Sequence, residues 1–246
     1  MLTRDILQLQ DYRRYLGLPA SETLSEGQLR QSLIETLIGG PEGRELWIFA
    51  YGSLMWNPLL SFDRMEVARL EGWRRSFCLE MVAGRAAPES PGRMLALVRG
   101  GATDGLAFRL SRETLAEDLD RLWTREMIVG SYCPLWAPVR FRDGRKADAI
   151  TFVADVRQAH YRPGAAVSEV AGVISGAVGP MGRNTDYVFS LDSALRANAL
   201  RDDYVSDLAA ALVGAGSQRP DSGSTIDLTP PAHTCSSAMP AARCGS

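Results

Sequence analysis

The chain has 246 residues, of which 46% are hydrophobic and 23% charged, so it can form one large domain or two small ones with a sizeable core. Its formal net charge of −2 argues against nucleic acid or an anionic membrane as a general partner. The sequence holds neither a run of eighteen apolar residues nor an apolar N-terminal signal, so we predict no membrane span and no secretion. The four cysteines show no C-x-x-C spacing and are interpreted as the reduced thiols of a cytoplasmic protein.

Residues 1–43 are predicted to form a helical N-terminal extension. A short helix comes first, and the run from Ser25 to Gln28 then resembles a capping box. Apolar residues follow at helical spacing until Gly39-Gly40 ends the second helix. We predict no chemistry in this segment and expect it to pack on the main domain or on a partner.

The stretch from Trp47 to Leu54 predicts a buried strand that stops abruptly in a loop of small residues. Bulky and β-branched side chains fill its first positions, whereas Ala50, Gly52 and Ser53 are small. We expect Gly52 to adopt backbone angles that are closed to other residues. Such a loop exposes backbone N–H groups that could hold an anion or a polarised carbonyl oxygen. The residues alone favour the simpler alternative, a tight turn after a core strand.

The main domain is predicted to span residues 44–213 and to begin with short strands. The predicted strands are 46–50, 66–70, 74–81, 94–98, 105–110, 136–142 and 148–155. Asp143-Gly144 is a strong hairpin signal between two of them, and Gly100-Gly101 is a weaker one. Because several strands precede the first good helix and regular alternation is missing, the pattern favours an α+β fold whose mixed or antiparallel sheet could curl into a small barrel.

Helices dominate the rest of the chain. We predict one from Ser111 to about residue 125, and the others near 168–178, 185–199 and 202–213. From residue 214 to residue 246 the sequence is rich in Gly, Ser, Thr, Pro and Ala. This composition predicts a disordered tail that is dispensable for stability and activity, because it offers too little apolar surface to offset the entropy of ordering.

Glu126 is the candidate for proton transfer. Three leucines share one face of the helix predicted over 111–127, and Glu126 follows in line four residues after Leu122. A partly desolvated carboxylate has a raised pKa and can exchange a proton near neutral pH. The residues alone favour the alternative, in which Glu126 lies past a fraying helix end and pairs with Arg121 or Arg125.

The sequence offers few nucleophiles. Ser53 would need a base, yet His233 lies in the predicted tail and His160 in a loop. The G-x-S-x-G motif is absent, which argues against a serine hydrolase. We interpret Cys133 as a small core residue.

Other candidate positions admit structural interpretations. The glycines between residues 172 and 182 match neither a dinucleotide-binding fingerprint nor a P-loop. Asn184 or Thr185 is predicted to cap a helix, where it could also face an anion. Arg74 and Arg75 are expected to be solvated, although one of them could face a substrate carboxylate.

The stretch from Ile48 to Trp56 resembles the signature loop of the ChaC-like family of glutathione-specific γ-glutamylcyclotransferases. Four further blocks agree in order and spacing: Trp73–Phe77, Pro91–Leu97, Arg125–Met127 with Gly130 and Tyr132, and Gly179–Tyr187. The resemblance covers about residues 44–200, and the combination of blocks is specific. The family often has Gly where this chain has Ala50, which is also small.

The resemblance implies a γ-glutamylcyclotransferase-like mixed β-barrel flanked by helices, without a cofactor or metal. It also implies that glutathione is converted to 5-oxoproline and cysteinylglycine, with Glu126 as the proton acceptor. It assigns the binding of the γ-glutamyl group to Ile48, Phe49, Ala50, Tyr51, Gly52, Ser53 and Leu54. We expect a monomer whose partner is a small-molecule substrate. Two alternatives stay open: a cyclotransferase for another γ-glutamyl amine or amino acid, and a non-catalytic γ-glutamyl-binding protein.

Overall fold

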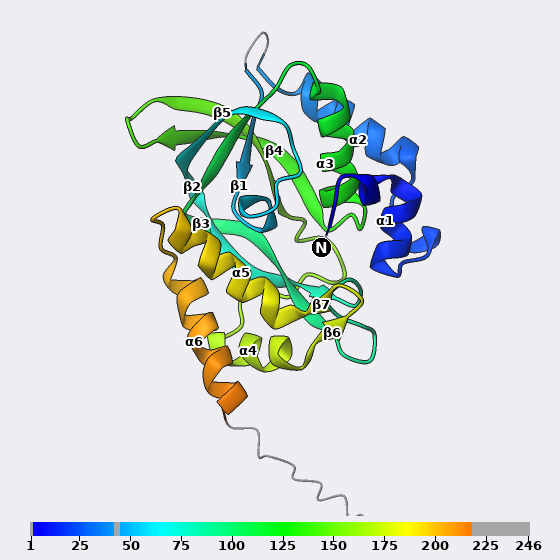
Figure 1. Cartoon of the computed structure of the whole chain (residues 1–246), viewed down its shortest axis with the longest axis vertical. Coiled ribbons are helices and arrows are strands. Elements are labelled where there is room, and N and C mark those ends of the chain that lie inside the picture. Colours follow the sequence, from blue (N-terminus) through cyan, green and yellow to red (C-terminus); the bar gives the residue numbers. More distant parts are fainter. Residues whose placement is uncertain (1, 42–44, 218–246) are drawn as a thin grey trace, which may run out of the picture.

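A computed structural model of the chain describes residues 2–41 and 45–217. Its centre is a closed barrel of five strands in the order β1-β3-β2-β4-β5, with an additional pairing between β3 and β5 (Figure 1). The strands are β1 (Trp47–Ala50), β2 (Phe62–Met81), β3 (Gly92–Leu110), β4 (Tyr132–Phe141) and β5 (Lys146–Ala154). β5 runs parallel to β1 and to β3, whereas the other pairs are antiparallel, so the predicted mixed barrel is confirmed.

β2 and β3 are long strands, and each was predicted as two short ones: 66–70 and 74–81 for β2, and 94–98 and 105–110 for β3. The prediction of a turn at Gly100-Gly101 is wrong, because both glycines lie inside β3, with φ angles of 107° and 67°. Gly72 faces them on β2 with φ of 79°, and the register shifts between Glu71 and Trp73. The positive φ angles therefore form a β-bulge that bends both strands. The Asp143-Gly144 hairpin between β4 and β5 is confirmed.

The helices occupy the predicted places with shifted ends. They are α1 (Leu9–Leu16), α2 (Glu26–Ile38), α3 (Leu115–Met127), α4 (Val167–Gly176), α5 (Asn184–Ala197) and α6 (Asp203–Ser217). Short 3-10 turns η1 (Asp5–Leu7), η2 (Ala20–Glu22) and η3 (Ser53–Met55) and a small hairpin of β6 (Val178–Gly179) and β7 (Gly182–Arg183) complete the fold. The Ser25–Gln28 capping box is confirmed. No helix in the described ranges has the length and apolarity needed to cross a membrane.

Two helix boundaries differ from the prediction by four residues. α3 begins at Leu115 rather than at Ser111, whose backbone N–H instead donates to the Ser61 carbonyl at 3.0 Å. α6 continues to Ser217, into the segment predicted as a tail. Residues 218–246, which make up the rest of that predicted tail, lie outside the described residues.

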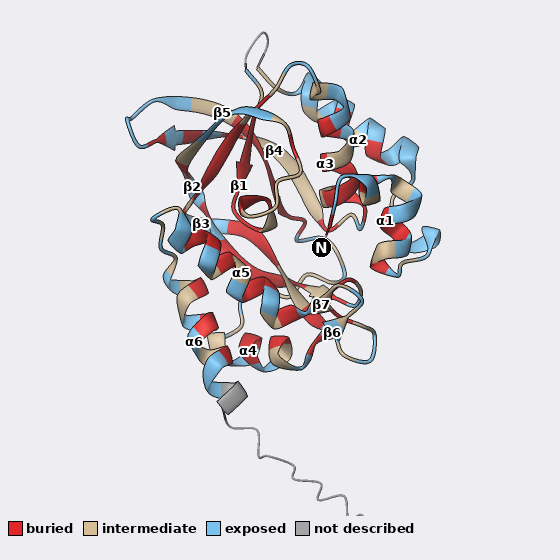
Figure 2. Cartoon of the chain, viewed as in Figure 1, coloured by how far each residue is buried: buried red, intermediate tan, exposed pale blue. Residues whose placement is uncertain are grey.

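The helices cover the barrel in two groups (Figure 1). α1, α2 and α3 lie along one side, and α4, α5 and α6 cover the other end of the long strands. Buried residues line the barrel and the helix faces that touch it (Figure 2). Trp123 of α3 packs its ring edge against Phe152 of β5 at 5.4 Å between centroids, so α3 is fixed directly to the barrel core.

The N-terminal segment packs on the main domain, which was one of the two predicted alternatives. Leu7, Tyr12 and Leu16 form an apolar cluster with Ile128, just beyond α3. The Leu24 N–H donates to the Ile128 carbonyl at 2.8 Å. The segment is therefore held against the end of α3 that carries Glu126.

Candidate active site

A cavity of about 820 Å³ opens where β1 ends, between α3 and the N-terminal segment. Its volume falls within the range of about 300–1,000 Å³ that is usual for small-molecule sites. Its polar lining includes Tyr51, Ser53, Arg125, Glu126, Tyr132, His160, Asp186 and Tyr187. This is the place where the loop and the carboxylate singled out in the sequence come together.

The predicted binding stretch divides between the cavity wall and the barrel core. Phe49 and the run from Tyr51 to Leu54 line the cavity. Ile48 and Ala50 do not, because they are buried in the core and β1 pairs them with residues of β3. We therefore expect these two to support the loop rather than to touch a ligand.

Gly52 is needed for space rather than for an unusual φ angle. Its φ of −126° and ψ of −133° lie outside the left-handed region that glycine favours. A Cβ on Gly52 would lie 2.7 Å from the Tyr187 hydroxyl and 3.3 Å from Leu95 Cδ2. Trp56 and Phe77 pack edge-on against the Tyr187 ring, which leaves that ring little room to move.

The loop after β1 presents backbone donors. The Ser53 N–H donates to the Tyr187 hydroxyl oxygen at 3.2 Å. The N–H groups of Gly52 and Leu54 have no hydrogen bond to any residue that the structure describes. Two neighbouring unpaired amides are a suitable pair of donors for an oxyanion.

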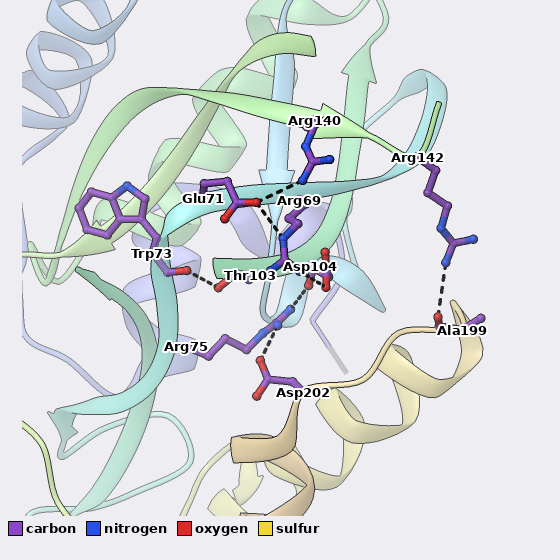
Figure 3. A network of polar contacts seen from close by, with 10 residues as sticks. All are labelled: Arg69, Glu71, Trp73, Arg75, Thr103, Asp104, Arg140, Arg142, Ala199 and Asp202. Atoms are coloured by element: carbon purple, nitrogen blue, oxygen red, sulfur yellow. Dashed lines mark hydrogen bonds and ion pairs between the residues drawn. The ribbon is translucent and has the colours of Figure 1, made fainter. Parts of the chain in front are cut away.

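Arg75 holds this loop through the carbonyl of Tyr51, and Figure 3 shows its other partners, Asp104 and Asp202. The side chain is 1% exposed, and its Nε donates to the Tyr51 carbonyl at 2.8 Å. Its Nη1 pairs with Asp202 at 2.8 Å, and its Nη2 donates to the Asp104 carbonyl at 2.7 Å. The prediction that Arg75 is solvated is therefore wrong, because its guanidinium is satisfied inside the protein by groups distant in the sequence. Arg74 is exposed, as predicted.

Glu126 lies inside α3, one residue before its end, with a side chain that is 15% exposed. Burial raises the pKa of its carboxyl, and the neighbouring Arg125 opposes this shift. Oε1 is 3.2 Å from Arg125 Nε, yet it makes no aligned hydrogen bond to another described residue. The alternative of a frayed helix end is wrong, and Arg121 instead pairs with Glu117 at 3.0 Å. Pairing with Arg125 is correct.

Arg125 links the carboxylate to the loop, a role that the sequence did not reveal. Its Nη2 donates to Ser53 Oγ at 2.9 Å, and its Nη1 donates to the Asn57 carbonyl at 2.5 Å. With Nε beside Glu126, one guanidinium holds the carboxylate and the loop in a fixed relation. The only signal in the sequence was its place next to Glu126.

Three tyrosines line the cavity together with Glu126: Tyr51 and Tyr187, which are buried, and Tyr132, which is half-buried. None was predicted as a site residue apart from Tyr51. The Tyr51 hydroxyl donates to the Phe152 carbonyl at 2.6 Å, and the Tyr132 hydroxyl donates to the Leu95 carbonyl at 2.7 Å. Burial raises the pKa of all three and brings that of Tyr187 to about 12, so they are neutral at pH 7. The charge of Glu126 contributes to each of these shifts, which places all of them in its electrostatic field.

The remaining candidates take lesser positions. Asn184 is the first residue of α5 rather than its cap, and its side chain bonds both the N–H (2.8 Å) and the carbonyl (3.1 Å) of Arg93. Cys133 is half-buried on β4, away from the cavity lining. Asp186 lies in the lining and pairs with Arg85 at 3.5 Å. The described residues contain no group of three potential metal ligands.

The sequence of the chain matches a family model and several known proteins. The family model described as ChaC-like protein matches residues 46–214. The glutathione-specific γ-glutamylcyclotransferase of Escherichia coli K12 is 44% identical over 209 residues, which cover 85% of this chain and 90% of that protein. The glutathione-specific γ-glutamylcyclotransferase 1 of Danio rerio is 30% identical over 176 residues, or 68% and 89% of the two chains.

A solved structure shares the fold. The yeast γ-glutamylcyclotransferase specific to glutathione superposes with a TM-score of 0.62 at 18% identity, over 70% of this chain and 99% of that one. At this level of identity the likeness shows the architecture alone.

Proposed function

The chain belongs to the ChaC-like family, and we propose that it is a glutathione-specific γ-glutamylcyclotransferase in which Glu126 transfers the proton. It converts glutathione to 5-oxoproline and cysteinylglycine. The observation that supports this assignment most strongly is the link through Arg125, which lies 3.2 Å from Glu126 and 2.9 Å from Ser53 Oγ. It joins a desolvated carboxylate to a loop with unpaired backbone donors inside one cavity.

The reaction can be written as an internal aminolysis. Glu126 removes a proton from the α-ammonium of the γ-glutamyl group, and the free amine attacks the γ-amide carbonyl carbon. A C–N bond forms and closes a five-membered ring, and the carbonyl oxygen becomes an oxyanion. Glu126 gives its proton to the leaving nitrogen as the old amide C–N bond breaks. It then takes the second proton from the ring nitrogen and passes it to the freed amine of cysteinylglycine, which leaves as an ammonium. Atoms and charge balance without an external reactant.

The cavity supplies orientation and charge stabilisation for these steps. The N–H groups of Gly52 and Leu54 are the proposed oxyanion donors, since removal of one such donor commonly costs about a hundredfold or more in rate. Tyr187, which accepts from the Ser53 N–H, adds a neutral hydroxyl beside them. Holding the amine against the carbonyl is worth several kcal/mol, up to about ten in an ideal geometry.

We also propose that the protein acts as a monomer in the cytoplasm, without a nucleic-acid or membrane partner. The net charge of −2 supports the absence of a nucleic-acid or anionic-membrane partner. Size-exclusion chromatography with light scattering would test the oligomeric state.

The assignment is tested by incubating the protein with glutathione and measuring 5-oxoproline and cysteinylglycine. We expect both products in equal amounts. A parallel reaction with γ-glutamyl-alanine separates the alternatives. Release from γ-glutamyl-alanine alone would favour a cyclotransferase for other γ-glutamyl compounds, and binding of glutathione with no release from either would favour a non-catalytic binding protein.

Gly52→Ala should lower kcat/KM for glutathione by about tenfold or more. The new Cβ would lie 2.7 Å from the Tyr187 hydroxyl, so the hydrogen bond from Ser53 to Tyr187 must be disturbed. Gly52→Val, with two more methyl groups, should abolish 5-oxoproline formation. Gly172→Ala is the matched control, because its Cβ would meet nothing within 4 Å. A Gly52→Val variant that folds and binds glutathione normally would show that the loop does not bind the substrate.

The acidic limb of the pH profile of kcat/KM should report the raised pKa of Glu126. A general base works in its ionised form, and burial keeps this carboxyl protonated at pH values where an ordinary glutamate is ionised. Activity on glutathione should therefore fall as the pH drops, with a midpoint above the usual value of 4.5. Circular dichroism at each pH would show that the enzyme stays folded. A midpoint at or below 4.5 would contradict the assignment of this limb to Glu126.

A further inference from the structure

Part of the cavity wall comes from the N-terminal segment, which lies before the region that matches the family model. That model begins at residue 46, whereas the cavity lining includes Leu2, Tyr12, Tyr15, Leu16 and Leu18. The sequence predicted no chemistry in this segment. The structure instead places its first helix, α1, against the same space as Glu126.

Hydrogen bonds hold this wall in place at several points. They run from Asn57 Nδ2 to the Leu2 carbonyl (3.1 Å), from the Gly84 N–H to the Leu16 carbonyl (3.3 Å) and from the Leu24 N–H to the Ile128 carbonyl (2.8 Å). Apolar contacts with Ile128 and Met181 fill the space between these bonds. The wall is therefore attached both to the end of α3 and to the segment after β2.

Tyr12 is the polar residue of this wall that lies in the field of Glu126. It is 6% exposed, and its ring stacks on Tyr15 at 6.4 Å. Burial raises the pKa of its hydroxyl, Arg125 lowers it and Glu126 raises it further. The hydroxyl makes no hydrogen bond to another residue in the described part of the chain, and its oxygen is not among the enclosed atoms, so it is open to the cavity.

The part of the substrate that meets this wall follows from the reaction. Ring closure requires the γ-glutamyl group to lie against Glu126 and the 51–54 loop. Whatever is bonded to the γ-carbonyl must then extend through the rest of the cavity, which α1, the 82–85 segment and Met181 line.

We propose that α1 forms the wall that contacts the cysteinylglycine half of glutathione, and that the Tyr12 hydroxyl donates a hydrogen bond to its peptide carbonyl. Tyr12 is thus a specificity-determining residue contributed from outside the barrel. This inference rests on the proposed function, because it takes the γ-glutamyl end to lie at Glu126. It gives a partner to a cavity-facing hydroxyl that has none among the described residues.

The test is Tyr12→Phe, assayed with glutathione and with γ-glutamyl-ethylamide, whose leaving amine carries no carbonyl. We expect kcat/KM for glutathione to fall by about tenfold, the size of one lost hydrogen bond, and the value for γ-glutamyl-ethylamide to change by less than about twofold. The melting temperature should stay about equal, since no hydrogen bond within the described part of the protein is lost. Tyr161→Phe is the matched control, because Tyr161 does not line the cavity.

Each other outcome is decisive. Equal losses on both substrates would place the contact at the γ-glutamyl half and overturn the inference, as would no loss on either. Calorimetric binding of glutathione separates this inference from the proposed function. If the wild-type protein shows no turnover but binds glutathione about tenfold more tightly than Tyr12→Phe, the proposed function fails and the contact stands. If the wild-type protein neither binds nor turns over glutathione, both fail.

Discussion

Glu126→Gln should lower the turnover of glutathione by about a hundredfold or more, while the variant still folds and binds the substrate. Glutamine keeps the shape of the side chain and its contact with Arg125, but it cannot accept a proton from the α-ammonium. Turnover would be measured as 5-oxoproline release, binding by calorimetry and folding by thermal melting, all on one preparation.

The same variant should be at least as stable as the wild-type protein at pH 7. Burial raises the pKa of Glu126, so the folded state binds this proton more tightly than the unfolded chain. The stabilising contribution is therefore complete below the unfolded pKa and is lost as the pH rises through the folded one. At neutral pH the buried, ionised carboxylate lowers the free energy of unfolding. The neutral glutamine does not have this cost.

The control is Glu117→Gln, the same change on the same helix at a side chain that is 70% exposed. It breaks only a surface ion pair with Arg121, so stability should change by less than about 1 kcal/mol and turnover should be normal. Folded, binding-competent Glu126→Gln with near-normal turnover would remove Glu126 from the mechanism. Asp186, on the cavity lining, would be the next candidate.

Arg75→Met should destabilise the protein by about 3 kcal/mol or more, because removal of one partner leaves a largely buried charge without its counterion. Asp202 is 14% exposed, and the carbonyls of Tyr51 and Asp104 lose their donor as well. The loop should also loosen, so glutathione turnover should fall in the fraction that remains folded. Urea unfolding and 5-oxoproline release measure the two effects.

Arg74→Met provides the comparison for this change. It replaces the same residue type one position earlier on β2, where the side chain is exposed. We expect its unfolding midpoint to match that of the wild-type protein within about 0.5 kcal/mol. An Arg75→Met midpoint equal to that of Arg74→Met would show that the loop does not depend on the buried guanidinium.

Short sequence patterns predicted most helices and strands. They failed where the same residues are compatible with two different backbone structures. The capping box at Ser25 and the hairpin at Gly144 depend on neighbouring residues, so a short window contains all the information. Gly100-Gly101 supplies positive φ angles equally well to a turn and to a bulge. Only the long pairing of β2 with β3 decides between them, and that pairing is not local.

The candidate site likewise contains features set by neighbouring residues and features set by residues distant in the sequence. The leucine stripe within one helix made Glu126 a candidate, but only the family resemblance favoured it over an ion pair with Arg121 or Arg125. The hydrogen bond between Ser53 and Tyr187 spans 134 residues, and the pair of Arg75 and Asp202 spans 127. No spacing rule connects such partners, so a buried guanidinium looked like a solvated one. Tyr12 lay outside every motif, and only packing brings it to the cavity.

The contacts of Arg75 with Tyr51, Asp104 and Asp202 determine when the site can assemble during synthesis of the chain. A ribosome synthesises the 51–54 loop early, but the groups that complete it, Tyr187 and Asp202, emerge near the end of the barrel domain. Until then the buried guanidinium lacks its counterion, and the loop cannot hold its final shape. A nascent chain that stops before residue 202 therefore carries the signature loop and Glu126 without an assembled site. Glutathione in the surrounding solution is exposed to the enzyme only after nearly the whole domain has been translated and closed.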